Sequence, residues 1–245
     1  MATPISVMGV GPGVISASAC WVCSPDGSIR LLWAGFTCSF GGVRGRSLVA
    51  DERRDLVALL RTLSDAEWQA PSLCDGWQVR DVVAHVLYDT IPARRYLADM
   101  VKCRFSVDRL NNRLVDRERE TPTSRLVDRL ERSVGRGPFA RAAPATALAD
   151  VLVHHQDIRR PLGRQRSIPE QRLLSVLNHP DPFALPWRHT RGLRFVATDV
   201  DWAKGRGPEV RGTGEAIVLA AVGRPVVIDE LTGDGVAELL RRLQH

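Results

Sequence analysis

Apolar residues recur at helical spacing in several segments of residues 51–163, and this periodicity constrains the fold more than any other feature. Gly135 and Pro161 each close one of these segments, because proline cannot continue a helix and glycine favours its end. The segments cover residues 51–63, 77–100, 124–135 and 144–160. Each has one apolar face, as expected of helices that bury one side. Four such helices joined by short polar loops predict a helical bundle over residues 49–163.

The pattern changes after this region. Residues 164–190 are rich in proline and are expected to form a linker. Further along, three short runs suggest strands and two segments have the apolar spacing of helices. The predicted strands are 193–200, 208–212 and 225–231, and the predicted helices are 213–224 and 235–243. Residues 191–245 are therefore expected to form a small α+β domain, which makes the chain mainly α with an α+β C-terminal part.

The first 48 residues differ from the rest because they are rich in glycine and serine and have no sustained apolar periodicity. We expect no stable domain there: residues 1–48 are either a disordered extension or a stretch translated from a start codon placed too early. Cys20 and Cys23 form a Cys-x-x-Cys pair, and Cys38 follows. The segment contains no histidine, so a zinc site would lack its fourth ligand.

Charge and hydropathy indicate which kinds of molecule the chain is not expected to bind, and where it is expected to be located. The chain has 34 Lys and Arg against 28 Asp and Glu, a net charge of +6, but both signs are interleaved and no nucleic-acid-binding motif is present. We therefore expect no nucleic-acid partner. No run reaches the roughly 20 apolar residues that cross a bilayer, and the first basic residue is Arg30, too late for a secretory signal. A cytoplasmic protein with reduced cysteines is expected.

The positions of the histidines indicate a possible chemical function more strongly than any other residues do. His154 follows Asp150 by four residues in the segment 144–160, so the two side chains share one helix face. His85 lies next to the apolar stripe of another predicted helix. Two imidazoles and one carboxylate suit zinc or another divalent transition metal and leave coordination positions open. From spacing alone, a helical histidine beside an aspartate is more often a hydrogen-bonded pair without a metal.

Three further residues near His154 have two readings each. Arg159 and Arg160 could hold a substrate carboxylate through paired hydrogen bonds, or they could complement the dipole at the end of their helix. Asp157 could accept a hydrogen bond from His154 or from the following histidine, or it could be a solvated carboxylate.

Three sequence blocks, in this order, resemble the mycothiol-dependent maleylpyruvate isomerase family of the DinB-like superfamily. They are SLCDGWQVRDVVAHVL at 72–87, ADVLVHHQDIRRPLG at 149–163 and GLRFVATDVDWAKGRGPEVRGTGEAIVLAAVGR at 192–224. The resemblance implies a DinB-like four-helix bundle that holds a divalent metal, usually zinc, followed by a small α+β domain. It also implies His85, Asp150 and His154 as the metal ligands. The described isomerase has glutamate where this chain has Asp150, whose side chain is one methylene shorter.

The resemblance implies an enzyme that uses mycothiol. A metal-stabilised thiolate is a strong nucleophile at neutral pH and would add to a small electrophilic substrate. Isomerisation and S-transfer both remain open, as does the alternative of a DinB-like protein that binds a metal without catalysis. The expected partners are a small-molecule thiol and a small electrophile, without a membrane. The sequence leaves the oligomeric state open.

Overall fold

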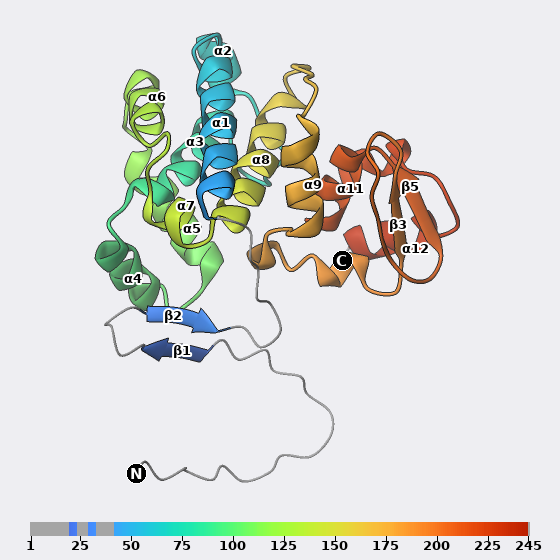
Figure 1. Ribbon diagram of the computed structural model, residues 1–245. Coiled ribbons are helices and arrows are strands. Elements are labelled where there is room, and N and C mark those ends of the chain that lie inside the picture. The colour runs from blue at the N-terminus through green and yellow to red at the C-terminus, as the bar shows by residue number, and fades with distance from the viewer. Residues whose placement is uncertain (1–19, 24–28, 33–41, 245) are drawn as a thin grey trace, which may run out of the picture. The chain divides into compact units, whose positions relative to one another are not determined.

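The computed structural model describes residues 20–23, 29–32 and 42–244 of the chain (Figure 1). Two short strands, β1 (Cys20–Cys23) and β2 (Ile29–Leu32), form an antiparallel pair. The predictions for the rest of residues 1–41 lie outside the described residues, and so do the side chains of the cysteine pair. Residues 40–245 form a separate compact unit that contains all the elements below.

Four helices form a closed ring, as the apolar periodicity predicts. They are α1 (Gly42–Leu60), α3 (Val79–Val86), α6 (Thr123–Arg132) and α8 (Pro144–Arg159). α1 and α3 each pack against both α6 and α8. Their apolar faces meet in a core that includes Leu56, Val82, Leu126, Val151 and Ile158. The first helix begins at residue 42, nine residues earlier than predicted, and its added part carries Val49 and Ala50 into the core.

Shorter elements connect the four helices. α2 (Asp65–Gln69) begins with a capping box, in which the side chains of Ser64 and Glu67 each accept the other's backbone N–H. The long segment 77–100 breaks before Pro92 into α3, the 3₁₀ turn η1 (Leu87–Thr90) and α4 (Ala93–Lys102). α5 (Val107–Glu118) packs against α3, and α7 (Pro138–Ala142) packs against α8.

A buried carboxylate fixes the start of α7. Asp89 accepts hydrogen bonds from the backbone N–H groups of Phe139 at 2.6 Å and Ala140 at 3.1 Å, and it pairs with Arg53 at 2.5 Å. Gly137 adopts a φ of 126°, and a Cβ there would collide with the Asp89 carboxylate. Glycine is therefore required where the chain approaches Asp89, and this approach holds Phe139 beside η1.

The proline-rich segment 164–190 is more than the linker that was expected. It contains α9 (Glu170–Asn178), the 3₁₀ turn η2 (Pro182–Ala184) and the short α10 (Trp187–Thr190). Pro169 directly precedes α9, where a missing N–H has no cost, so the proline starts a helix instead of preventing one. α9 packs against α8 on one side and against α11 (Gly214–Ala221) on the other. It joins the bundle and the C-terminal part into one continuous apolar core.

The C-terminal part is a small α+β unit, as predicted (Figure 1). β3 (Arg194–Ala197) lies between β4 (Ala203–Gly205) and β5 (Glu209–Gly212), antiparallel to β4 and parallel to β5. α11 packs against this sheet, and α12 (Val236–Leu243) closes the unit. These elements and the helical ring confirm the expected fold class, mainly α with a small α+β part at the C-terminus.

The strand predicted at residues 225–231 is wrong. Pro225–Glu230 forms the 3₁₀ helix η3, which packs against α11 and α12. Its β-branched residues favour a strand by propensity, but that preference depends on the packing environment. Here Pro225 occupies the first helical turn, and Val227 is fully buried while its neighbour Val226 is half exposed. A proline suits the first turn of a helix, whereas in a strand it could not donate a backbone hydrogen bond to a neighbour.

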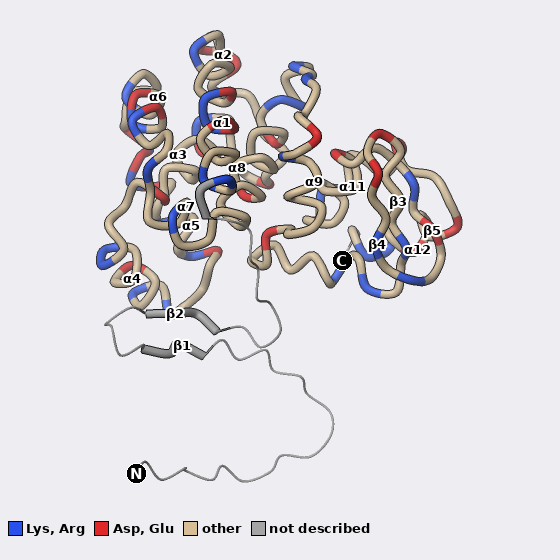
Figure 2. Tube along the Cα trace, viewed as in Figure 1, with Lys and Arg blue, Asp and Glu red and all other residues tan. Residues whose placement is uncertain are grey.

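Charges of both signs lie along α1 and α6 (Figure 2), as expected from their interleaving in the sequence. Within the described residues, no helix has the length and the apolar character that crossing a membrane requires.

Candidate metal centre

α8 supplies most of the polar side chains of the candidate site. Asp150, His154 and Asp157 follow one another at spacings of four and three residues, so they share one face of the helix. The remainder of α8 is almost entirely buried, because the helix lies between the bundle and α9. His85 reaches the same place from α3, which packs against α8. The structure therefore brings together the three residues that the sequence singles out as metal ligands.

The spacing of the donor atoms fits a metal ion. Asp150 Oδ1 lies 3.4 Å from His85 Nε2 and 3.5 Å from His154 Nε2. These distances exceed the roughly 2.7–2.9 Å of a charge-assisted hydrogen bond. They match the separation of about 3.4 Å between two ligands of a tetrahedral zinc whose bonds are about 2.1 Å long. The three residues therefore form a donor set that suits a divalent metal.

Asp157 holds the His154 ring in place. Its Oδ2 accepts a hydrogen bond from His154 Nδ1 at 2.9 Å. Because Nδ1 carries the proton in this bond, Nε2 is left to face Asp150 and His85. A carboxylate that orients a metal-binding imidazole in this way is a common support of metal sites. Asp157 is thus a buried hydrogen-bond acceptor for His154, one of the two readings of the sequence.

The two histidines respond differently to their surroundings. Burial lowers the pKa of His85 below its ordinary value, so this imidazole stays neutral and available as a ligand. Burial acts in the same direction on His154, but the hydrogen bond with Asp157 and the charge of Asp150 raise its pKa well above the ordinary value. Metal binding at His154 therefore has to displace a proton.

Arg224 is a site residue that sequence reasoning missed. It follows α11 and donates from Nε and Nη2 to the two oxygens of Asp157, each at 2.8 Å. Burial would raise the pKa of Asp157, but Arg224 and His154 hold it well below its ordinary value. Arg224 is the last residue of the third block of family resemblance, but no local spacing rule connects it to α8.

Cys74 is a second missed residue. Its thiol donates to Asp157 Oδ2 at 3.1 Å, and Arg224 Nη2 lies 3.4 Å from its Sγ. Cys74, His154 and Asp157 form a second group of possible metal donors, which shares His154 with the first group. The two groups differ in the ring nitrogen that faces them, since Nδ1 points to Asp157 and Nε2 to Asp150.

Arg159 and Arg160 lie elsewhere. Arg159 donates from Nε to His155 Nε2 at 2.8 Å. Arg160 donates to Glu215 at 2.7 Å and to Glu230 at 2.5 Å, so it pairs with the C-terminal part. Neither residue is among the side chains that line the cavity described next. The arginine at the candidate site is therefore Arg224, and the two predicted arginines have protein partners instead.

A cavity of about 400 Å³ opens over the three donor residues. Its walls combine aromatic, amide and acidic side chains from the bundle with residues of η2 and the end of α11. Besides the metal candidates, it is lined by Cys74, Asp75, Trp77, Tyr88, Tyr96, Val107, Asp108, Asn111, Asn112, Phe139, Thr146, Asp181, Phe183, Ala184, Val222 and Arg224. This volume accommodates a small organic molecule beside the donor set.

Known proteins support the resemblance seen in the sequence. Residues 49–137 match the family described as "Mycothiol maleylpyruvate isomerase N-terminal domain". This match includes His85 but ends before α8. The fold is similar to a crystal structure of the mycothiol-dependent maleylpyruvate isomerase and to one of its histidine-to-alanine mutant. In both cases the TM-score is 0.55 at 18% sequence identity, over 80% of this chain and 93% of the other.

The search of curated proteins gives no match. The solved structures establish a shared fold, and the family match covers the first three helices of the ring. Residues 49–137, somewhat more than a third of this chain, are thus similar to the mycothiol maleylpyruvate isomerase N-terminal domain.

Proposed function

We propose that the chain is a cytoplasmic, metal-dependent enzyme that uses mycothiol either to isomerise a small electrophile or to transfer the mycothiol thiolate to it as a stable adduct. The observation that carries this proposal is the donor set of His85, Asp150 and His154 at a cavity wall. Three protein ligands beside a cavity are typical of a metal that keeps a position open for a cofactor or substrate. The names of the family and of the matched structures support mycothiol as the thiol.

Zinc is the metal that this donor set favours, since two imidazoles and a carboxylate are ligands that zinc accepts in tetrahedral sites. When bound, such a metal stabilises a thiolate and so supplies a nucleophile at neutral pH. His85, which burial keeps neutral, and His154, which Asp157 orients, would hold it together with Asp150.

Arg224 has a separate role in this proposal. It lines the cavity, its side chain is about one-fifth exposed, and Asp157 fixes its guanidinium from below. A fixed cation at this position can stabilise the negative charge that develops on an electrophile when a thiolate adds to it. In an isomerase the adduct then rotates about the former double bond and expels the thiol, whereas in a transferase the adduct is the product.

Elemental mass spectrometry of the purified full-length protein, followed by calorimetric titration with mycothiol, tests the proposal. We expect about one metal ion per chain, as for a single three-ligand site, and saturable thiol binding that depends on the metal. His85→Ala and His154→Ala should both lose the metal, while His179→Ala, a histidine outside the cavity, should keep it. Unchanged metal content in the first two variants would rule out the site. Metal without thiol binding would favour the non-catalytic alternative.

A further inference from the structure

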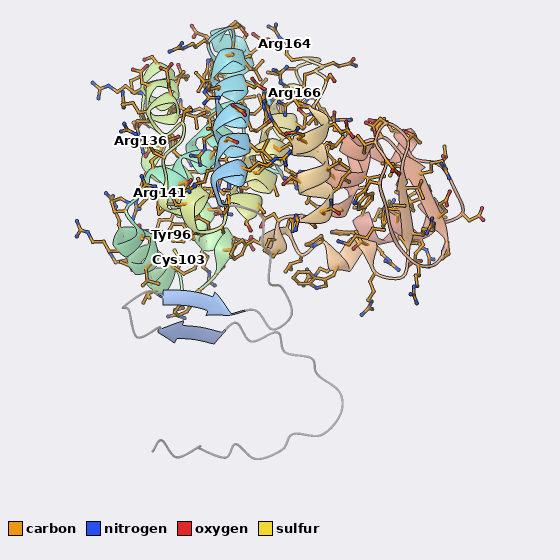
Figure 3. The ribbon with its side chains drawn as sticks, in the orientation of Figure 1. Tyr96, Cys103, Arg136, Arg141, Arg164 and Arg166 are labelled. Carbon is orange, nitrogen blue, oxygen red and sulfur yellow. The ribbon has the colours of Figure 1, made fainter. Side chains whose placement is uncertain are left out.

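The chain contains two tyrosines, and both line the cavity beside the donor set. Tyr88 lies in η1, three residues after His85, so the two side chains share one face of a continuous helical segment. Tyr96 reaches the cavity from α4 (Figure 3). The proposed function gives neither tyrosine a role. Two phenol hydroxyls at the wall of one cavity therefore need an explanation.

The hydroxyl of Tyr88 has no hydrogen-bond partner among the described residues. The residue is only 9% exposed, and a buried phenol hydroxyl usually forms a hydrogen bond. Within the same part of the chain, the side-chain polar atoms that are sealed from solvent without a partner are Arg53 Nε, His85 Nδ1 and His189 Nδ1. The Tyr88 hydroxyl is not one of them, so it opens onto the cavity that Tyr88 lines. A molecule in the cavity can therefore accept its hydrogen bond.

Aromatic packing fixes the direction of this hydroxyl. The ring centroid of Tyr88 lies 5.6 Å from that of His85 and 5.3 Å from that of Phe139. Phe139 is held in turn, because its backbone N–H donates to the buried Asp89 carboxylate at 2.6 Å. A donor whose position is set in advance needs no rearrangement when charge develops on a bound molecule. Tyr88 is thus a preorganised donor beside the metal candidates.

Tyr88 remains a donor whether or not a metal is bound. Burial, and after it the negative charge of Asp150, raises the pKa of Tyr88 well above its ordinary value of 10.0. A metal ion bound to Asp150 would reduce the second of these effects. A phenol with the ordinary pKa is nevertheless protonated at neutral pH. The hydroxyl therefore adds a neutral hydrogen-bond donor to the site, and this role does not depend on the charge balance of the cavity.

Tyr96 is the weaker candidate of the two. It is less buried than Tyr88, and its helix α4 packs mainly against α5, which carries none of the three metal candidates. Its ring centroid lies 6.3 Å from that of Tyr88 and 5.5 Å from that of Phe139. Tyr96 therefore contributes its ring to the aromatic wall, and Tyr88 is the tyrosine that stands next to the reacting centre.

We propose that Tyr88 holds the electrophile through an oxygen atom, to which its hydroxyl donates a hydrogen bond. This inference rests on the proposed function, because it identifies a substrate-binding group of the same site. When the thiolate sulfur bonds to a carbon of the electrophile, the displaced electron pair moves to this oxygen, and Tyr88 stabilises the charge while it keeps its own proton. In an isomerase the electron pair returns as the sulfur–carbon bond breaks. In a transferase the adduct takes up a proton from water.

Two probes of nearly equal size test the assignment on the full-length protein as purified. Acetophenone carries a carbonyl oxygen, and α-methylstyrene has a methylene group in its place. Ligand-observed NMR titration gives both affinities. We expect Tyr88→Phe to weaken acetophenone binding about tenfold, as for the loss of one hydrogen bond, and to leave α-methylstyrene binding unchanged. The carbonyl stretch of bound acetophenone should also lie at a lower infrared frequency in the parent protein than in Tyr88→Phe.

An unchanged acetophenone affinity or an unchanged carbonyl frequency in Tyr88→Phe would overturn the inference, and so would a parent protein that binds no acetophenone. Tyr96→Phe is the matched variant, because it removes the other hydroxyl of the cavity and keeps the ring. It should have little effect on either measurement. A loss in Tyr96→Phe equal to that in Tyr88→Phe would contradict the assignment to Tyr88. Thermal unfolding shows that each variant is folded.

The same samples separate this inference from the proposed function. Tyr88→Phe should keep the metal content of the parent, and a loss of metal would overturn the inference by showing that the hydroxyl is a metal ligand. If acetophenone binding depends on Tyr88 but the parent binds no mycothiol, the proposed function fails and the oxygen site stands. If metal and mycothiol bind and acetophenone binding does not depend on Tyr88, the inference fails and the proposed function stands.

Discussion

His154 and His155 are neighbours in α8, yet they contact different parts of the protein and their pKa values shift in opposite directions. His154 donates to Asp157 through Nδ1 and presents Nε2 to Asp150. His155 uses both nitrogens within the protein, because Nδ1 donates to Glu52 at 2.8 Å and Nε2 accepts from Arg159. The pKa of His154 is raised well above its ordinary value, whereas burial lowers that of His155 to about 4.

The comparison shows that burial and a carboxylate partner do not by themselves define a ligand. Both histidines have an acidic neighbour, but the second nitrogen decides the role. Arg159 can only donate, so His155 Nε2 must accept and has no lone pair left for a metal. His154 Nε2 meets another imidazole and a carboxylate oxygen instead of a donor.

The largest expected effect is a loss of folding stability, caused by a change beside His155. Glu52 is fully buried and binds His155, Arg166 and Arg172; Arg166 follows α8 (Figure 3). Glu52→Gln leaves buried arginines without their full counter-charge and should lower the free energy of unfolding by about 3–5 kcal/mol. Chemical denaturation measures the loss. The metal content per folded chain of Glu52→Gln should stay unchanged. If this variant lost as much metal as His154→Ala, the metal-binding role of His154 and the structural role of His155 would not be separate.

The next effect concerns metal affinity. His154→Gln removes an imidazole ligand and should weaken metal binding by more than about 100-fold, since losing even a supporting partner costs up to about that much. His155→Gln is the matched variant, one residue away, and should retain the metal but unfold more easily. Competition with a chelator, together with thermal unfolding, measures both properties. Similar metal affinities in the two variants would show that the assignment of roles is wrong.

A smaller loss of metal affinity is expected for the residue that orients His154. Asp157→Asn keeps the size of the side chain but weakens the hydrogen bond to Nδ1 and the pairing with Arg224. We expect metal affinity to fall by about 10- to 100-fold. Chelator competition gives the value, and Asp65→Asn, an exposed aspartate of α2, serves as the control. An unchanged affinity would mean that the ring is held by packing alone.

The two histidines should also differ in how folding stability depends on pH. Between pH 6.5 and about 4, the unfolded chain protonates His155 while the folded chain does not, so stability falls as the pH falls. Each such group contributes at most about 1.4 kcal/mol per pH unit. Glu52, whose pKa the contacts with His155 and Arg166 lower to about 2 against the effect of burial, adds to this loss below pH 4.5.

His154 has the opposite sign in the metal-free protein. Its raised pKa contributes stability below pH 6.5, and this contribution is lost as the pH rises through the folded-state value. In denaturation of the chelator-treated protein, His155→Gln should lose less stability than the parent as the pH falls below 6.5, and His154→Gln should lose less stability than the parent as the pH rises above 6.5. Parallel curves for both variants would contradict the opposite pKa directions.

Local spacing explains what the sequence could predict. The helices of the ring follow from apolar periodicity, and Asp150 and His154 share a face because they are four residues apart. His85 joins them because α3 packs against α8, and neighbouring helices of this kind are what the predicted bundle provides. The contact of Asp157 with His154 follows from the same local rule, at a spacing of three residues.

Other features depend on contacts between distant parts of the chain. Arg224 reaches Asp157 across 67 residues, and Arg160 finds Glu230 across 70, separations for which no spacing rule exists. The helix α9 was missed because prolines mark both turns and helix starts. Residues 225–231 were assigned to a strand because β-propensity alone does not report which side of a segment is buried.

The position of α8 between two layers has a consequence for how this protein can be divided. Leu148 and Leu152 of α8 belong to the same core as Leu173 and Val176 of α9. A fragment that stops at residue 163 would leave this surface open to water and would tend to associate with other copies. It would also lack Arg224. The sequence suggests two modules, the helical bundle and the C-terminal part. Recombination between relatives would nevertheless give a stable protein only where the bundle and the C-terminal part come from the same parent.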